Sequence, residues 1–255
     1  ASGKGGVGKS TVAVNLAVAL SQLQVNGRAL RVALVDVDFY GPSIPTLMGG
    51  GEIKPDHQGK ILPAMRHGVK YISIAFFLKQ ADDPVVWRGP MFGKAISQLF
   101  GDVAWGEVDV CVIDMPPGTG DAQISLSQLV KLDGVVMVTT PQEVALSDVR
   151  RAINMFRKVN VEILGIVENM AGFVTPDGKS FDIFGKGGGA ALAKGYGLNL
   201  LTSFPIDMSV REGGDSGMPV ALNENSPVGK QYAGLAEQLW STLESRSQPQ
   251  LQIVN

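Results

Sequence analysis

The stretch that decides the fold stands at the start of the chain and reads Gly3-Lys4-Gly5-Gly6-Val7-Gly8-Lys9-Ser10-Thr11. It matches the phosphate-binding pattern G-x-x-x-x-G-K-[ST] at every required position. Its glycines can adopt backbone angles closed to other residues, so successive N–H groups can turn inward around phosphate oxygens. Lys9 supplies a point charge to the β- and γ-phosphates, and the Ser10 hydroxyl is a hard oxygen ligand for Mg²⁺. The stretch therefore predicts a loop that binds a nucleoside triphosphate or its diphosphate product.

The residues after this loop predict the helix that such a loop requires. Apolar residues recur at three- and four-residue spacing from Lys9 to about Gln24, and Asn26-Gly27 ends the pattern. The positive amino end of this helix therefore faces the phosphates. Lys4 is a second lysine inside the loop, which the pattern does not require. It is either a solvated loop charge or a group that reaches phosphates across a subunit interface.

The composition is that of a soluble globular protein. A length of 255 residues suits one large domain, and 45% hydrophobic with 18% charged residues is an ordinary balance. No apolar stretch is long enough to span a bilayer, and a net charge of −2 gives no electrostatic argument for nucleic acid or anionic lipid. The single cysteine, Cys111, excludes an intrachain disulfide and favours a small apolar residue over a reactive thiol. We therefore expect a cytoplasmic protein with no membrane or nucleic-acid partner.

Apolar runs that alternate with helical patterns predict the fold class. Four runs are nearly continuous and end in polar residues, as buried strands of a parallel sheet do: Arg31–Asp38, Val108–Asp114, Gly134–Thr140 and Ile163–Asn169. The alternation predicts an α/β fold with a doubly wound, mostly parallel sheet in a single P-loop NTPase domain. A phosphate loop normally follows a buried strand, and only Ala1 and Ser2 precede this one. We therefore expect the first strand to lie upstream of this chain.

Polar residues at the ends of these strands predict where the ligand lies. Ligands of parallel α/β sheets bind at the carboxyl ends of the strands. The side chains that fall there, on the same edge as the phosphate loop, are Asp36, Asp38, Asp114 and Asn169. An aspartate that follows a second buried strand is typical of a residue that orders Mg²⁺, in part through water. The sequence thus predicts a nucleotide and metal site at one edge of the sheet.

The remaining segments predict surface features or leave alternatives open. Short apolar segments on both sides of Arg66-His67-Gly68 are typical of a hairpin or paired edge strands, and the polar surroundings of His57 and His67 favour ordinary surface roles. Arg88 precedes a helical pattern and either contacts phosphate or stacks on an aromatic ring. The glycine-rich excursion 172–189 contains a turn at Thr175-Pro-Asp-Gly178. A closing helix is predicted from about residue 227 to 243.

Motifs outside the loop carry a family resemblance. Together with Lys4, the stretches Asp36-Val-Asp38-Phe-Tyr-Gly-Pro, Asp114-Met-Pro-Pro-Gly-Thr-Gly-Asp121 and Glu168-Asn-Met170 resemble the deviant Walker A ATPases, which include MinD, ParA and the nitrogenase iron protein. Within that superfamily the chain is most similar to the Mrp/ApbC group of iron–sulfur cluster carrier ATPases. The supporting stretches are Trp87-Arg-Gly-Pro-Met91, Phe181-Asp-Ile-Phe-Gly185 and Val210-Arg-Glu-Gly-Gly-Asp-Ser-Gly217. The resemblance covers residues 1–255 as one ATPase domain and implies an N-terminal partner domain outside this chain.

The resemblance implies how a site of this kind works. It implies a nucleotide-sandwich homodimer that hydrolyses ATP slowly, in which Lys4 of one subunit reaches the nucleotide held by the other. Lys4, Lys9 and Asp38 would be catalytic, with Asp38 orienting the attacking water. Ser10, Asp36 and Asp114 would hold Mg²⁺ and its waters.

The resemblance also implies a base pocket beside the phosphate loop, which itself comprises Gly3, Lys4, Gly5, Gly6, Val7, Gly8, Lys9, Ser10 and Thr11. Asn169 would read the adenine edge, and Pro205 with Asp207 would form the other wall. The alternative for Asn169 is an ordinary turn residue at the end of a strand. ATP or ADP and Mg²⁺ are therefore the expected cofactors.

One departure from the family pattern bears on the cargo. Carriers of this group hold a [4Fe–4S] cluster between subunits through a Cys-Pro-x-Cys pair before Phe-Asp-Ile-Phe-Gly. Here that excursion reads Phe173-Val-Thr-Pro-Asp-Gly-Lys-Ser180 and has no cysteine. Iron–sulfur clusters require thiolates or comparably soft ligands, so we expect no iron–sulfur ligands in this chain at that place.

Two functions remain on these grounds. The first is an Mg²⁺-dependent ATPase of the iron–sulfur carrier family that acts with assembly proteins or apo-protein clients. The second is a MinD- or ParA-like switch, in which ATP-driven dimerisation recruits a protein partner. A membrane version of that switch needs a basic amphipathic C-terminal helix, and Arg246 is the only cation between Leu239 and Asn255.

Overall fold

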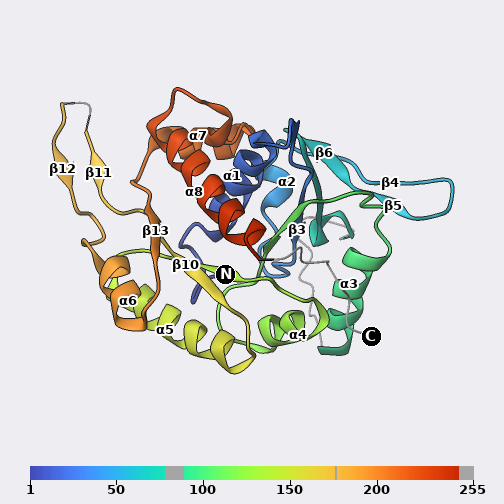
Figure 1. Cartoon of the computed structure of the whole chain (residues 1–255), viewed down its shortest axis with the longest axis horizontal. Helices are drawn as coiled ribbons and strands as arrows, with labels where there is room; N and C mark the ends of the chain where they lie inside the picture. Colours follow the sequence, from blue (N-terminus) through green and yellow to red (C-terminus); the bar gives the residue numbers. More distant parts are fainter. Residues whose placement is uncertain (78–88, 176, 247–255) are drawn as a thin grey trace.

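The computed structural model describes residues 1–77, 89–175 and 177–246, and it has an α/β architecture (Figure 1). Seven strands build the central sheet in two parts. The first part has the order β6 (Ala64–Arg66), β7 (Val69–Ser73), β3 (Val32–Asp36) and β8 (Val110–Asp114). The second has the order β13 (Leu200–Ser203), β10 (Ile163–Glu168) and β9 (Val135–Thr139). All pairs are parallel except β6 with β7, which confirms the predicted mostly parallel sheet.

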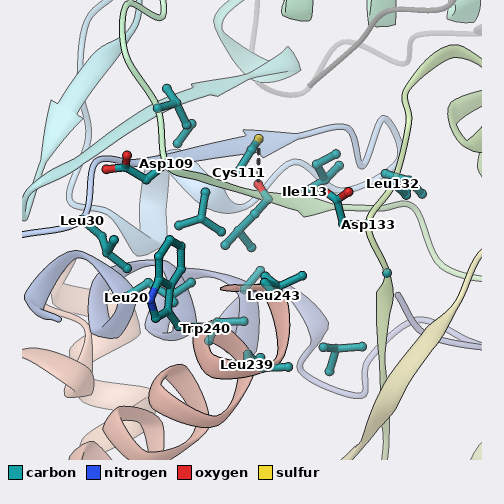
Figure 2. A pocket seen from close by; sticks show the side chains of 18 of the residues that line it. Leu20, Leu30, Asp109, Cys111, Ile113, Leu132, Asp133, Leu239, Trp240 and Leu243 are labelled. Atoms are coloured by element: carbon teal, nitrogen blue, oxygen red, sulfur yellow. Dashed lines mark hydrogen bonds between the residues drawn. The ribbon is translucent and has the colours of Figure 1, made fainter. Parts of the chain in front are cut away.

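A cavity of about 750 Å³ lies between β8 and β9, where the two parts of the sheet face each other (Figure 2). Its walls are largely apolar and include Ile113 of β8 and Leu239 and Trp240 of the C-terminal helix. Ser2 forms a parallel bridge with Val138 of β9 at one end of this gap. Because of the cavity, most of β8 is half-buried, whereas the sequence predicts a strand buried on both faces.

Helices cover both faces of the sheet, as the prediction of a doubly wound fold requires. On one face α1 (Lys9–Gln22) packs against α8 (Pro227–Glu244), and both contribute to a core that also includes Leu34 and Phe204. On the other face lie α3 (Gly89–Gly101), α4 (Asp121–Leu129), α5 (Glu143–Lys158) and α6 (Gly188–Tyr196). The buried side of α5 carries Val149, Ile153 and Phe156, as its periodicity predicts.

Shorter elements connect this framework. The helical ones are α2 (Ile44–Leu47), η1 (Ile74–Phe77), α7 (Met208–Ser216) and η2 (Val220–Leu222). The hairpins are β1 (Gln24–Val25) with β2 (Arg28–Ala29), β4 (Lys54–Pro55) with β5 (Ile61–Leu62), and β11 (Phe173–Val174) with β12 (Ser180–Phe181). The β11–β12 hairpin projects from the body of the molecule (Figure 1), and its turn is closed by a Gly178 N–H bond to the Thr175 carbonyl at 2.8 Å. The turn predicted at these residues is therefore confirmed.

The two histidines and the single cysteine differ in their burial. His57 is exposed, whereas His67 is half-buried and its Nε2 lies 2.9 Å from the Gly217 carbonyl oxygen. Cys111 is half-buried beside the cavity, and burial raises the pKa of its thiol to about 12, which keeps it unreactive near neutral pH. Trp87 and Arg88 lie outside the described residues. Among the described helices, none is both long and apolar enough to cross a membrane.

Candidate nucleotide-binding site

The phosphate loop ends at the amino terminus of α1, whose N-cap is Gly8. Gly6 and Gly8 have φ angles of 80° and 81°, in the left-handed region that favours glycine. Gly8 is the N-cap of α1 and offers no side chain to the first-turn N–H groups. The first turn of α1 therefore has no capping side chain at the end where the helix dipole is positive, which is an arrangement that suits an anion.

Lys9 lies at the centre of a buried charge cluster. Its ammonium is 2.6 Å from Asp114 Oδ1 and 3.1 Å from Asp38 Oδ2, and it donates to Ser10 Oγ at 3.2 Å. Only 8% of the Lys9 side chain is exposed. The fold thus brings together the loop, the end of β3 and the end of β8, whose Asp36 and Asp114 are direct register partners. The Lys9 ammonium thus has two charged acceptors close to it, and a phosphate oxygen is an acceptor of the same kind.

Asp36 is the most enclosed carboxyl group of the cluster. It is fully buried and accepts hydrogen bonds from Ser73 Oγ at 2.8 Å and from the Asp38 N–H at 3.1 Å. Burial, and then the nearby Asp114 charge, raise its pKa to about 7. Sequence reasoning missed Ser73 as a partner of this site, although a polar residue at the end of the apolar run Val69–Ser73 is a usable indication.

The raised pKa predicts that the metal-free protein loses stability as pH rises from about 4 to about 7. Over that window the folded Asp36 keeps a proton that the unfolded carboxyl releases, so folding becomes less favourable. Asp36→Asn should flatten this slope and stabilise the protein at pH 8 by ~2 kcal/mol, allowing for partial relaxation of a shift worth roughly 1.4 kcal/mol per pKa unit. Urea unfolding in the presence of a chelator, at several pH values from 5 to 8, measures the free energy of unfolding of each variant. Asp215→Asn, at an exposed position on α7, is the control, and an unchanged slope in Asp36→Asn would contradict the assignment.

The residues of this edge fit an Mg²⁺ ion held partly through water. Asp114 Oδ2 is buried and has no hydrogen-bond partner among the described residues, which leaves an acceptor for a metal-bound water. Ser10 Oγ is a second hard oxygen next to Lys9. No group of three or more His, Cys, Asp or Glu side chains in the described part of the chain is arranged as a complete metal site. An Mg²⁺ ion here would therefore need phosphate oxygens and waters to complete its ligands.

Asn169 contacts the phosphate loop directly. It follows β10, its Nδ2 donates to the Val7 carbonyl at 3.0 Å, and its own N–H bonds to the Thr139 carbonyl at 2.7 Å. A Cβ atom on Gly8 would lie 2.2 Å from the same Nδ2. Asn169 thus holds the loop through the Val7 carbonyl, and it lies at the edge where the sequence predicts a base-reading residue.

Gly8→Ala is expected to weaken nucleotide binding by at least ~10-fold, because the new methyl group meets Asn169 in a loop whose φ already disfavours alanine. Gly27→Ala is the matched control. Gly27 has a φ of 78°, and a Cβ atom added there would meet no atom within 4 Å, so this variant has the backbone strain without the clash. Calorimetric titration with ADP compares the two variants, and equal affinities would show that the contact with Asn169 is unimportant.

The remaining predicted site residues are Pro205, Asp207 and Lys4, and they lie in different surroundings. Pro205 follows Phe204, whose carbonyl accepts from the Ala171 N–H at 2.8 Å, so Pro205 lies beside the end of β10. Asp207 is the N-cap of α7 and accepts from the Ser209 N–H at 2.7 Å, which gives its carboxylate a structural partner. Lys4 is half-buried and forms no ion pair with any described residue. Within the described part of this chain the Lys4 ammonium therefore has no carboxylate partner.

Comparisons with known proteins identify the family of this chain. A family model described as NUBPL iron-transfer P-loop NTPase, of the ParA group, matches residues 1–240. The chain belongs to this family. The predicted resemblance to iron–sulfur cluster carrier ATPases is thereby confirmed, and Cys111 is the one cysteine of this NUBPL-type NTPase.

Relatives of this NUBPL-type NTPase have names that refer to iron and sulfur. An iron–sulfur cluster carrier protein of Aquifex aeolicus is 49% identical over 249 residues, covering 96% of this chain and 67% of that protein. An Arabidopsis thaliana protein described as an iron–sulfur protein required for NADH dehydrogenase, mitochondrial, is 48% identical and covers 99% and 80%. A solved nucleotide-binding protein of Archaeoglobus fulgidus in complex with ADP has a TM-score of 0.72 at 38% identity, covering 88% of this chain and 86% of that one. MinD of Pyrococcus horikoshii, with a TM-score of 0.69 at 22% identity and coverage of 97% of each chain, shows the shared fold.

Proposed function

We propose that this protein is a slow, Mg²⁺-dependent ATPase that acts as a homodimer within iron–sulfur cluster assembly. The observation that carries the proposal is the Lys9 ammonium held between Asp38 and Asp114 at the uncapped amino end of α1. The family membership supports a nucleotide at this place, as does the ADP complex of the Archaeoglobus relative. Calorimetric binding of ADP and ATP, followed by measurement of phosphate release with and without Mg²⁺, tests it.

In this proposal each side chain has one role. Lys9 exchanges its carboxylate partners for the β- and γ-phosphates when nucleotide binds, and the backbone donors of Gly3–Thr11 hold the phosphate oxygens. Asp38 orients the attacking water, while Ser10, Asp36 and Asp114 hold the metal and its waters. Mg²⁺ would supply charge neutralisation of the phosphate oxygens. Asn169 reads the adenine edge, and Pro205 with Asp207 forms the other wall of the base pocket.

The homodimer completes the site in this proposal. Lys4 of one subunit would reach the nucleotide of the other, which accounts for a half-buried lysine without an ion pair among the described residues. Exposed apolar side chains on the edge that carries the site, such as Tyr40 and Val144, would be covered in that assembly. The partners would be assembly proteins or apo-protein clients, and the expected compartment is the cytoplasm.

The cluster is the proposed cargo of the pathway, but this hairpin has no soft ligands for it. Thr175 Oγ1 accepts from the Lys179 N–H at 3.1 Å, and Asp177 forms an ion pair with Lys179 at 2.8 Å. Both are oxygen groups that are already engaged in the turn. Cys111 lies on β8, in the other part of the sheet. We infer that the β11–β12 hairpin binds no cluster by itself.

Anaerobic reconstitution with iron and sulfide is therefore expected to leave the wild-type protein without a cluster. Thr175→Cys combined with Gly178→Cys restores the spacing Cys-Pro-x-Cys and should produce visible charge-transfer absorption with bound iron. Cys111→Ser in the same background is the control, and it should change nothing. Stoichiometric iron in the wild-type protein, lost in Cys111→Ser, would show that the cluster is held elsewhere.

A switch that recruits a protein partner is the second candidate. The MinD fold of this chain favours it, since ATP-driven dimerisation alone could provide the output. Light scattering of the Asp38→Ala variant with ATP measures whether the dimer forms. Capture of apo-protein clients by that dimer, with a measurement of transferred iron, then separates the two functions. Client binding by the ATP dimer without any transfer of iron would favour the switch.

A further inference from the structure

Glu168 is a buried carboxylate that the proposed reaction does not use. It is the last residue of β10 and only 3% exposed. Its Oε1 accepts the Gly189 N–H at 2.6 Å, and its Oε2 accepts from Ser203 Oγ at 3.2 Å. A charged group is buried only where such partners stabilise it, so the position of Glu168 is closely specified.

The carboxylate occupies the amino end of α6. The N-cap of this helix is Gly187, with a φ of 73° and no capping side chain. The preceding stretch Gly185-Lys-Gly-Gly-Gly189 resembles a second phosphate loop in composition. Glu168 already supplies the anion there, because its carboxylate bonds to a first-turn N–H group and complements the helix dipole. This hydrogen bond therefore links the amino end of α6 to the end of β10.

The residue next to Glu168 holds the nucleotide loop. Asn169 bonds to the Val7 carbonyl at 3.0 Å, so two consecutive side chains at the end of β10 reach in different directions. Their backbone is fixed on both sides, since the Asn169 N–H bonds to Thr139 and the Glu168 carbonyl accepts from the Phe204 N–H at 2.8 Å. Glu168 and Asn169 thus form one backbone segment that contacts both the phosphate loop and the amino end of α6.

The other end of this connection is the β11–β12 hairpin. The hairpin leaves the sheet at Gly172, whose carbonyl accepts from the Ile206 N–H at 2.8 Å, and the chain runs from β12 through residues 182–187 into α6. Between these two anchors it exposes Phe181 and Ile183, which are 50% and 56% exposed. The hydrogen bond between Glu168 and Gly189 thus anchors the chain to β10 where it enters α6 after the hairpin.

We propose that Glu168 is a positioning residue that couples nucleotide occupancy of the loop Gly3–Thr11 to the placement of α6 and the β11–β12 hairpin. The inference rests on the proposed nucleotide site. In this proposal nucleotide binding restricts the motion of the loop and of Asn169. Glu168, which is next to Asn169 in the chain, then restricts the motion of the amino end of α6 through its bond to Gly189. The hairpin, which is the surface available to a partner or second subunit, thereby responds to the nucleotide.

Tryptic cleavage after Lys179 and Lys186 measures the coupling in the intact protein. Both lysines are exposed, on either side of β12. We expect ADP with Mg²⁺ to slow cleavage of the wild-type protein at least ~5-fold, the lower range of typical allosteric couplings. In Glu168→Gln, which keeps an acceptor but loses the charge, the ratio of rates with and without ADP should fall below ~2-fold. The ADP affinity should also fall, because a coupling free energy between two sites acts in both directions.

Gly189→Ala breaks the same contact from the side of α6, since its Cβ would lie 2.9 Å from Glu168 Cβ. It should give the same loss of coupling and covers the case in which Glu168→Gln folds poorly. Glu162→Gln is the matched control just before the other end of β10, where the side chain is 60% exposed, and it should behave as the wild type does.

The outcomes are separable. A purely structural role would raise cleavage equally with and without ADP and preserve the ratio, which would overturn the proposal. Wild-type protein that binds ADP without any change in cleavage would overturn the coupling and leave the proposed nucleotide site intact. Absence of ADP binding to the wild type would overturn the proposed function and this inference with it.

Discussion

Lys9→Ala is expected to abolish tight nucleotide binding, with a loss of affinity for ADP of ~10²-fold or more. The ammonium makes charge-assisted bonds to more than one acceptor, and each such bond contributes roughly 1.5–3 kcal/mol. In the structure Asp114 and Asp38 lie 2.6 and 3.1 Å from this ammonium. Alanine removes the cation while leaving the carboxylates, so the site also becomes repulsive to phosphate. Calorimetric titration measures the loss.

This variant needs two controls because it leaves buried carboxylates without a counter-charge, which can destabilise the fold by ~3–5 kcal/mol. Lys9→Ala with Asp38→Asn removes one of the unpaired charges, and its affinity should stay lost although its stability improves. Lys4→Ala should bind ADP normally, since Lys4 is assigned to the other subunit's nucleotide. Affinity that survives Lys9→Ala would refute the phosphate-loop assignment.

Asp38→Ala should bind nucleotide and fail to hydrolyse it, with turnover lower by ~10²-fold or more, as expected when a group that positions the attacking water is removed. Binding is expected to persist because Asp38 is not a ligand of the phosphates and competes with them for Lys9, from which its Oδ2 is 3.1 Å away. Single-turnover phosphate release, measured beside ATP affinity, separates the two effects.

The control for this variant is Asp215→Asn, an exposed carboxylate on α7. It changes the same type of group away from the site and should keep wild-type turnover. Asp38→Asn keeps the shape of the side chain, and the Tyr40 N–H that donates to Asp38 Oδ1 at 3.2 Å keeps an acceptor. Turnover at the wild-type rate in either Asp38 variant would contradict the assigned role.

Much of the framework followed from local patterns. The helix after Gly8 and the buried run ending at Asp36 were predictable, because periodicity and continuous apolar runs report burial within a few residues of themselves. The α6 and α7 helices were missed. Glycine-rich stretches weaken the helical patterns of both segments. The amino end of α6 is also bonded by a carboxylate from a distant strand, Glu168, which no local pattern reveals.

The site divides in the same way. Sequence alone determined the loop Gly3–Thr11 and its chemistry, because the glycines, the lysine and the hydroxyl act within one continuous segment. Only the tertiary structure decided that Lys9 lies between Asp38 and Asp114, that Ser73 binds Asp36, and that Asn169 holds Val7. Those contacts join residues up to 162 positions apart, and their distances depend on strand order and register. The physical reason is that a sequence pattern reports the environment of its own segment, whereas the pairing of charges across strands is set by how the whole sheet packs.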